Sequence, residues 1–148
     1  MANILIIDDQ PFLAELISEA LFAEGHCIKR RKTFRSAVAE IGSGKPDMVL
    51  LDLYLQGTES WDLLHLLKLK APSLPVLVVT PHDDVITDPR LSEADGYLIK
   101  DIYLDKLKTK ISEVLLHSVV RSKMKGGCCF HPASKMVQII SCISSQAV

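Results

Sequence analysis

Five polar residues of this sequence have side chains that together could carry out phosphoryl transfer: Asp8, Asp9, Asp52, Thr80 and Lys100. Three carboxylates placed together repel one another, and a divalent cation such as Mg²⁺ removes that repulsion. A metal ion, an ammonium and a hydroxyl around one carboxylate can hold the oxygens of a phosphoryl group during an in-line attack. If an aspartate is the attacking group, the product is an acyl phosphate.

These residues stand at the ends of short apolar runs, which is the pattern of buried strands. The runs are Ile4–Ile7, Met48–Leu51, Val76–Val79 and Tyr97–Ile99. In a doubly wound sheet the carboxyl ends of the strands lie along one edge, and ligands bind in the crevice there. We therefore expect the five polar side chains to meet in one pocket, although they are far apart in the sequence.

The stretches between these runs have the i, i+3, i+4 apolar spacing of amphipathic helices. The predicted helices cover residues 13–21, 34–41, 61–69 and 104–115, and a weak strand pattern covers 26–30. Thr33 is expected to cap the second helix and Gly42–Gly44 to end it. Pro89 makes residues 83–93 a poor helix, because proline lacks the N–H that a helix interior needs.

Strands that are apolar throughout, each followed by a helix, indicate a parallel sheet with helices on both faces. Five such units in about 120 residues are too few for a closed eight-unit barrel, which needs about 250 residues. The predicted fold class is therefore α/β, with a three-layer, doubly wound, five-stranded parallel sheet.

Four segments resemble the receiver domain of two-component response regulators: Ile4–Asp9, Pro46–Leu53, Val76–Thr80 and Asp95–Lys100. All five hallmark positions carry the expected residue type in the expected order, and the resemblance covers residues 1–120. It implies the flavodoxin-like strand order 2-1-3-4-5. It also implies a protein that accepts a phosphoryl group from a histidine kinase or phosphotransfer protein, and that is no enzyme beyond its own phosphorylation and dephosphorylation.

The resemblance implies a role for each matching residue. Asp52 is implied as the phosphoacceptor, with Lys100 paired to it. Asp9 and Asp52 are implied as direct Mg²⁺ ligands, joined by the backbone carbonyl of Tyr54. Asp8 is implied to act on the metal mainly through water.

The resemblance also implies a conformational switch. Thr80 is expected to move toward the phosphoryl group, and Tyr97, three residues before Lys100, is expected to change rotamer in response. Such a switch shifts the populations of two surface conformations and so acts on a downstream protein. A second copy of the chain is one candidate partner.

Several positions differ from the family pattern. Pro81 follows Thr80 where a small residue is usual, and it lacks the N–H that could contact a phosphoryl oxygen. Gln56 and Ser60 stand where proline and glycine are common. Asp101 replaces a proline, which is typical of the branch whose receivers precede helix-turn-helix domains. The segment with the poor helix is also about two residues short, so we expect a truncated fourth helix.

The composition excludes several classes of protein. The net charge is −1, so no overall basic field indicates a nucleic-acid-binding protein. The first residues lack the pattern of a signal peptide, and the longest uncharged run, Met136–Val148, is shorter than the roughly 20 residues of a membrane span. Without an export signal, the four cysteines indicate reduced thiols. We therefore expect a cytoplasmic protein that binds neither a membrane nor, directly, nucleic acid.

The charge is unevenly distributed, since residues 1–120 carry a net −5 and residues 121–148 a net +4. We expect a receiver domain over 1–120 and a tail over 121–148 with no output domain. Two alternatives stay open. One is a phosphorylation-independent interaction module, held in one state by Pro81 and the irregular fourth helix, and the other is the input half of a DNA-binding transcriptional regulator. A phosphatase of the Asp-x-Asp type is disfavoured, because Tyr54 takes the place of the second aspartate.

Overall fold

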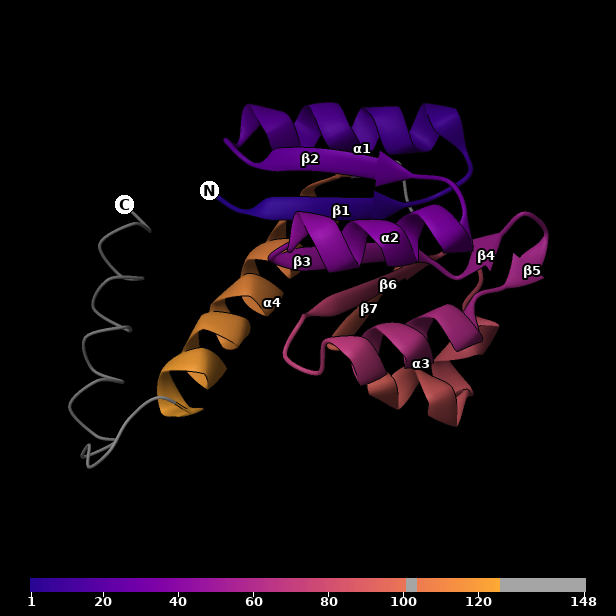
Figure 1. The fold of residues 1–148 in the computed structure, drawn as a ribbon. Helices are drawn as coiled ribbons and strands as arrows, with labels where there is room; N and C mark the ends of the chain where they lie inside the picture. The colour runs from indigo at the N-terminus through magenta and orange to yellow at the C-terminus, as the bar shows by residue number, and fades with distance from the viewer. Residues whose placement is uncertain (101–103, 126–148) are drawn as a thin grey trace.

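The computed structural model describes residues 1–100 and 104–125. Its central sheet has five parallel strands in the order β2-β1-β3-β6-β7 (Figure 1). Their bounds are β1 Asn3–Ile7, β2 Cys27–Arg31, β3 Met48–Asp52, β6 Val76–Thr80 and β7 Gly96–Ile99. Numbered along the chain, the strands of this sheet have the predicted order 2-1-3-4-5, so the predicted fold class is confirmed.

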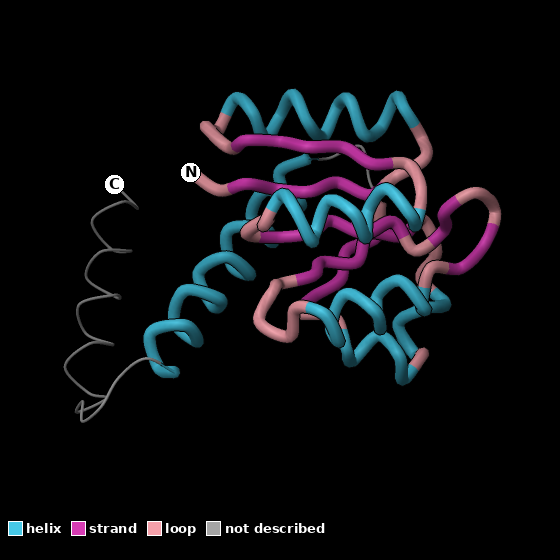
Figure 2. Tube along the Cα trace, viewed as in Figure 1, coloured by secondary structure: helices cyan, strands magenta, loops and turns pink. Residues whose placement is uncertain are grey.

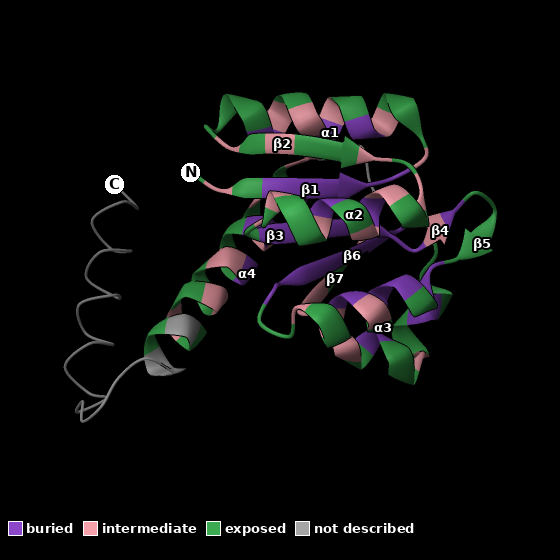
Figure 3. Ribbon diagram, viewed as in Figure 1, coloured by how far each residue is buried: buried purple, intermediate pink, exposed green. Residues whose placement is uncertain are grey.

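Helices cover both faces of the sheet, as Figures 1 and 2 show. α1 (Pro11–Ala23) and α4 (Leu104–Lys125) pack on the strand residues Ile4, Ile6, Met48, Leu50, Leu77 and Val79. α2 (Phe34–Gly44) and α3 (Trp61–Lys70) pack on the alternate strand residues Leu5, Ile7, Val49, Leu51, Val76 and Val78. Both faces of β1, β3 and β6 are therefore buried, whereas β2 at the edge is mostly exposed (Figure 3).

Both ends of α2 confirm their predictions. Thr33 caps the helix, since its side chain accepts a hydrogen bond from the Ser36 N–H. The helix also ends as predicted, since its last residue is Gly44 of the Gly42–Gly44 segment, and Lys45 follows in the left-handed conformation with φ 41°. A Cβ on Gly44 would meet the carboxyl group of Glu40, so that side chain would have to move to admit it.

The connection between β6 and β7 contains no α-helix. It forms two 3-10 helices, η1 (Asp84–Thr87) and η2 (Pro89–Glu93), which confirms the expected irregular fourth helix. Asp88 lies between them and caps η2, because its side chain accepts the N–H of Arg90. Pro89 occupies the first position of η2, where its missing N–H costs no helical hydrogen bond.

α4 continues to Lys125, so the first five residues of the segment assigned to the tail are helical. The division at residue 120 stays a prediction, and the rest of the tail and Asp101 lie outside the described residues. No helix in the part of the chain that the structure describes is long and apolar enough to cross a membrane.

A small hairpin between β3 and α3 was not predicted. β4 (Tyr54–Leu55) pairs antiparallel with β5 (Thr58–Glu59). The two residues of the turn, Gln56 and Gly57, both have positive φ, at 52° and 77°. Positive φ at both central residues defines the type I′ turn that two-residue hairpins favour.

Candidate functional site

The polar residues predicted to meet do lie together at the carboxyl edge of the sheet. Asp8 follows β1, Asp52 and Thr80 end β3 and β6, and Lys100 follows β7. The Nζ atom of Lys100 lies 2.9 Å from Asp8 Oδ2 and 2.7 Å from Asp52 Oδ2. All three side chains are nearly buried, with 7% of the lysine exposed. A buried ammonium needs negative partners. Lys100 therefore pairs with both carboxylates, and this pairing holds their side chains in place.

Asp8, Asp9 and Asp52 can each offer one carboxylate oxygen within 4.8 Å of the others. These oxygens suit Mg²⁺, which prefers a few carboxylates and keeps several waters. Asp9 is less buried than the other two, so the cluster opens toward solvent on its side. Asp8, Asp9 and Asp52 are thus the residues that could hold a metal ion here.

Backbone N–H groups orient all three carboxylates. The N–H of Gln10 donates to Asp8 Oδ1 at 2.8 Å, and that of Tyr54 donates to Asp52 Oδ1 at 3.0 Å. The N–H of Gln56, at the tip of the hairpin, donates to Asp9 Oδ2 at 2.8 Å. The backbone donors of Gln10 and Gln56 were not among the predicted site groups, because residue types do not reveal where main-chain N–H groups point.

Burial raises the pKa of Asp52 above its ordinary value, because desolvation disfavours the carboxylate. The hydrogen bonds from Lys100 and from the Tyr54 N–H oppose this effect, and the nearby charge of Asp8 adds to it. These two hydrogen bonds therefore do not fully offset the free-energy cost of burying the charged Asp52 carboxylate. A further cation beside it would favour its charged form.

The two predicted switch residues, Thr80 and Tyr97, differ in burial. Thr80 is fully buried; its Oγ1 accepts the N–H of His82 at 3.3 Å, and its carbonyl accepts the N–H of Lys100 at 2.7 Å. Tyr97 lies on β7, opposite Val78 in the register, with 40% of it exposed. A tyrosine with this exposure has room to change rotamer.

Tyr54 and His82 form a contact at the edge of the site. Their ring centroids are 5.0 Å apart with an interplanar angle of 70°, an edge-to-face arrangement. Tyr54 follows Asp52 by two positions and His82 follows Thr80 by two, so the contact joins the ends of β3 and β6. The predicted metal ligand of Tyr54 is its backbone carbonyl. Its side-chain ring instead packs against His82.

The response regulator receiver domain family matches residues 4–112 of the chain. The chain therefore belongs to this family. Its relatives include the probable transcriptional regulatory protein TcrX of Mycobacterium tuberculosis, 32% identical over 84% of this chain and 54% of TcrX. The transcriptional regulatory protein TcrA of the same species is 33% identical, over 74% of this chain and 44% of TcrA. The chain thus spans about half the length of these curated relatives.

Solved structures of similar proteins include two of the response regulator TrrA from Thermotoga maritima. One is a complex with Mg(2+)-BeF, with a TM-score of 0.73 and 28% identity over 77% of this chain and 99% of that one. The other is a complex of TrrA with the histidine kinase ThkA, with a TM-score of 0.72 and 29% identity over 78% of this chain and 99% of that one. NtrX from Brucella abortus has a TM-score of 0.78, with 26% identity over 97% of this chain and 34% of NtrX.

Proposed function

We propose that this chain is a receiver that takes a phosphoryl group on Asp52 from a histidine kinase or phosphotransfer protein, with Mg²⁺ as cofactor. The observation that carries the proposal is the position of Lys100 Nζ between Asp8 and Asp52, beside the third carboxylate of Asp9. The TrrA complexes with Mg(2+)-BeF and with a histidine kinase support the same chemistry in a relative.

In the proposed reaction a carboxylate oxygen of Asp52 forms a bond to phosphorus while the bond between phosphorus and the donor histidine nitrogen breaks. The imidazole keeps the electron pair of the broken bond. Lys100, already 2.7 Å from Asp52 Oδ2, stabilises the charge on the phosphoryl oxygens, and Thr80 donates a hydrogen bond to one of them. Bound Mg²⁺ supplies positive charge to the same oxygens.

Asp9, Asp52 and the carbonyl of Tyr54 are the proposed direct metal ligands, and Asp8 is proposed to act through water. The backbone donors to each carboxylate already orient them, so the chain's own part is to present oxygens in fixed positions. Thr80 and Tyr97 are proposed to transmit the change. The chain catalyses only its own phosphorylation and dephosphorylation under this proposal.

The output is proposed to be a protein contact, made in the cytoplasm by a receiver over residues 1–120. A second candidate is the input half of a DNA-binding regulator, and the names of TcrX and TcrA as transcriptional regulatory proteins favour it. A DNA-binding titration tests the second candidate. No specific complex is expected for a receiver that acts through a protein contact, and a specific complex would favour the DNA-binding regulator.

The test is the intact mass of the protein after incubation with Mg²⁺ and a small-molecule phosphodonor. Wild type is expected to gain one phosphoryl group, and EDTA is expected to prevent the gain. Asp52→Asn is expected to gain none, whereas Asp83→Asn, which changes an exposed aspartate at the same edge, is expected to react like wild type. If wild type gains nothing from either the small donor or a cognate kinase, the phosphorylation-independent interaction module replaces this proposal.

A further inference from the structure

The β4–β5 hairpin touches the acidic site at its tip. The N–H of Gln56 donates to Asp9 Oδ2 across 47 positions of sequence. Proline, which is common at this position in the family, has no N–H to donate, and its ring fixes φ near −65°, far from the 52° of Gln56. The orientation of the Asp9 carboxylate therefore depends on a turn that this sequence builds in its own way.

Two strands of two residues each do not hold a hairpin in place by themselves, because isolated hairpins are marginal in water. The hairpin must be held by contacts outside it. Leu55 gives one such contact, since it is buried in the core cluster on the α3 side of the sheet. Both residues of the other strand, β5, are exposed, so β5 needs a different support.

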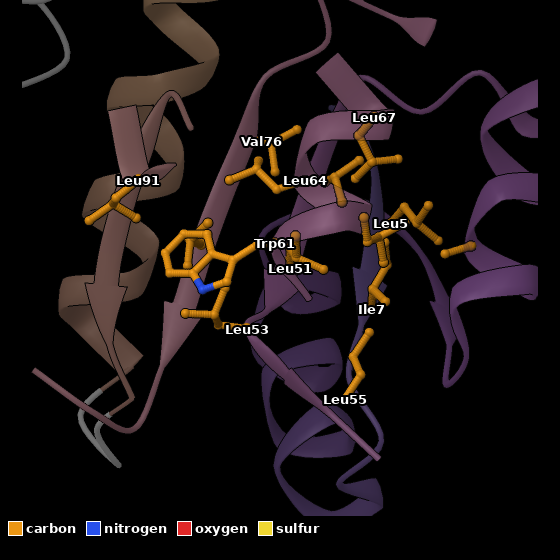
Figure 4. Packing of buried hydrophobic residues seen from close by; sticks show 14 of the residues in the cluster. Leu5, Ile7, Leu51, Leu53, Leu55, Trp61, Leu64, Leu67, Val76 and Leu91 are labelled. Carbon is orange, nitrogen blue, oxygen red and sulfur yellow. The ribbon is translucent and has the colours of Figure 1, made fainter. Parts of the chain in front are cut away.

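Glu59 of β5 is held by Trp61 and Arg90. The indole Nε1 of Trp61 donates to Glu59 Oε2 at 2.8 Å. Arg90 Nη2 lies 3.7 Å from the same oxygen, in an ion pair whose two side chains are each about half exposed. The Arg90 guanidinium also lies over the Trp61 ring, 4.5 Å from its centroid. Trp61 itself is 5% exposed and packs at the edge of the core near Leu53 and Leu91 (Figure 4).

Asp88 orients the guanidinium of Arg90 more closely than Glu59 does. The Nε and Nη2 atoms of Arg90 lie 3.0 and 2.6 Å from the two carboxylate oxygens of Asp88, a bidentate pair. The N–H of Arg90 donates to the same carboxylate at 2.9 Å. The guanidinium therefore joins η2 to β5, and so joins the segment that replaces the fourth helix to the hairpin over the acidic site.

We propose that Arg90 is a positioning residue for the magnesium site. It fixes Glu59, which fixes the hairpin and keeps the Gln56 N–H on Asp9. The inference rests on the metal site of the proposed function. Because coupling between two sites is reciprocal, binding of Mg²⁺ beside Asp9 also stabilises the arrangement of η2 that holds Arg90 over Trp61.

The test is titration of the metal-free full chain with Mg²⁺ by calorimetry, with no phosphodonor present. Arg90→Ala is expected to weaken Mg²⁺ binding at least three-fold. Arg90→Lys is expected to recover only part of the loss, since lysine lacks the planar group that pairs with Asp88 and stacks on Trp61. Arg30→Ala is the matched control, because it removes an exposed ion pair to Glu15 on the β2 side, and it is expected to leave the affinity unchanged.

A second readout needs no metal. Hydrogen exchange at the Gln56 amide is expected to become at least ten-fold faster in metal-free Arg90→Ala and to stay unchanged in Arg30→Ala. Unchanged Mg²⁺ affinity or unchanged Gln56 exchange in Arg90→Ala overturns the inference, as does a wild type that binds no Mg²⁺. A wild type that binds Mg²⁺ and accepts no phosphoryl group overturns the proposed function alone, since neither readout requires phosphorylation.

Discussion

The Nζ atom of Lys100 lies 2.7 Å from Asp52 Oδ2, although the two residues are 48 positions apart in the sequence. The parallel sheet makes this contact, because β3 and β7 both end at the same edge with β6 between them. The same ammonium is 2.9 Å from Asp8, so one buried cation faces two buried carboxylates. The site therefore carries an excess of negative charge on largely buried side chains.

Removing the ammonium leaves two buried carboxylates without their cation, and breaking a buried ion pair costs about 3–5 kcal/mol. Lys100→Met is therefore expected to lower the free energy of unfolding by about 3 kcal/mol in urea denaturation with EDTA present. Lys106→Met, which changes an exposed lysine of α4, serves as control and is expected to cost much less. If Lys100→Met lowers the free energy of unfolding no more than Lys106→Met does, Lys100 does not stabilise the fold through a buried ion pair.

Adding Mg²⁺ is expected to stabilise the folded protein, because a ligand that binds only the folded state adds about 2.7 kcal/mol at a hundred times its Kd. Thermal unfolding with and without Mg²⁺ measures this as a rise in Tm. Asp9→Asn removes one ligand oxygen from the cluster and is expected to remove most of the rise. Asp83→Asn is expected to keep the full rise in Tm. An equal rise in wild type, Asp9→Asn and Asp83→Asn would mean that Mg²⁺ binds elsewhere.

The raised pKa of Asp52 gives a pH dependence with a definite sign. The folded protein binds this proton more tightly than the unfolded chain, so the Asp52 contribution to stability falls as pH rises from the ordinary value of 3.8 through the raised pKa. Wild type and Asp52→Asn are compared by urea denaturation across this range without metal. The variant is expected to gain stability relative to wild type as pH rises, and a constant difference between the two contradicts the assignment.

The protonation of Asp52 also affects its proposed reaction with a phosphodonor. Only the charged carboxylate attacks phosphorus, so the rate of phosphorylation is expected to fall when acidification protonates Asp52. Bound Mg²⁺ favours the charged form and is expected to move this fall to lower pH as its concentration rises. Intact mass after short incubations at each pH and metal concentration measures both effects.

Pro81 removes an N–H beside Thr80, at the point where a phosphoryl oxygen on Asp52 would be held. Pro81→Ala restores that donor and is expected to lengthen the life of the phosphorylated protein several-fold. Loss of the phosphoryl group is followed by intact mass after the donor is removed. Pro72→Ala, at an exposed proline after α3, is the control, and equal lifetimes in the two variants assign Pro81 no part in stabilising the phosphorylated state.

Much of this architecture follows from patterns that a sequence displays directly. The apolar runs of β1, β3 and β6 are buried on both faces, which is why the runs are continuous and their ends are sharp. The positions of Asp52 and Thr80 at strand ends then place both side chains at one edge. Topology alone thus brings distant residues into one site.

The parts that could not be predicted depend on the backbone or on tertiary charge pairs. The β4–β5 turn needs positive φ at Gln56, a residue with no special tendency toward it, and only the following Gly57 signals a turn. Glu40 is buried on α2 because Lys29 and Arg31 of β2 both pair with it. A basic run in a sequence does not show which of its charges face a buried carboxylate.

Phosphorylation of Asp52 is tested most directly by identifying the residue that carries the phosphoryl group. Borohydride reduces an aspartyl phosphate to homoserine, which tandem mass spectrometry of the digested protein then locates. After incubation of wild type with Mg²⁺ and a phosphodonor, homoserine is expected at position 52 and at no other aspartate. Homoserine at Asp8 or Asp9 instead, or a gain in intact mass with no reduced aspartate, would contradict the assignment of Asp52 as the phosphoacceptor.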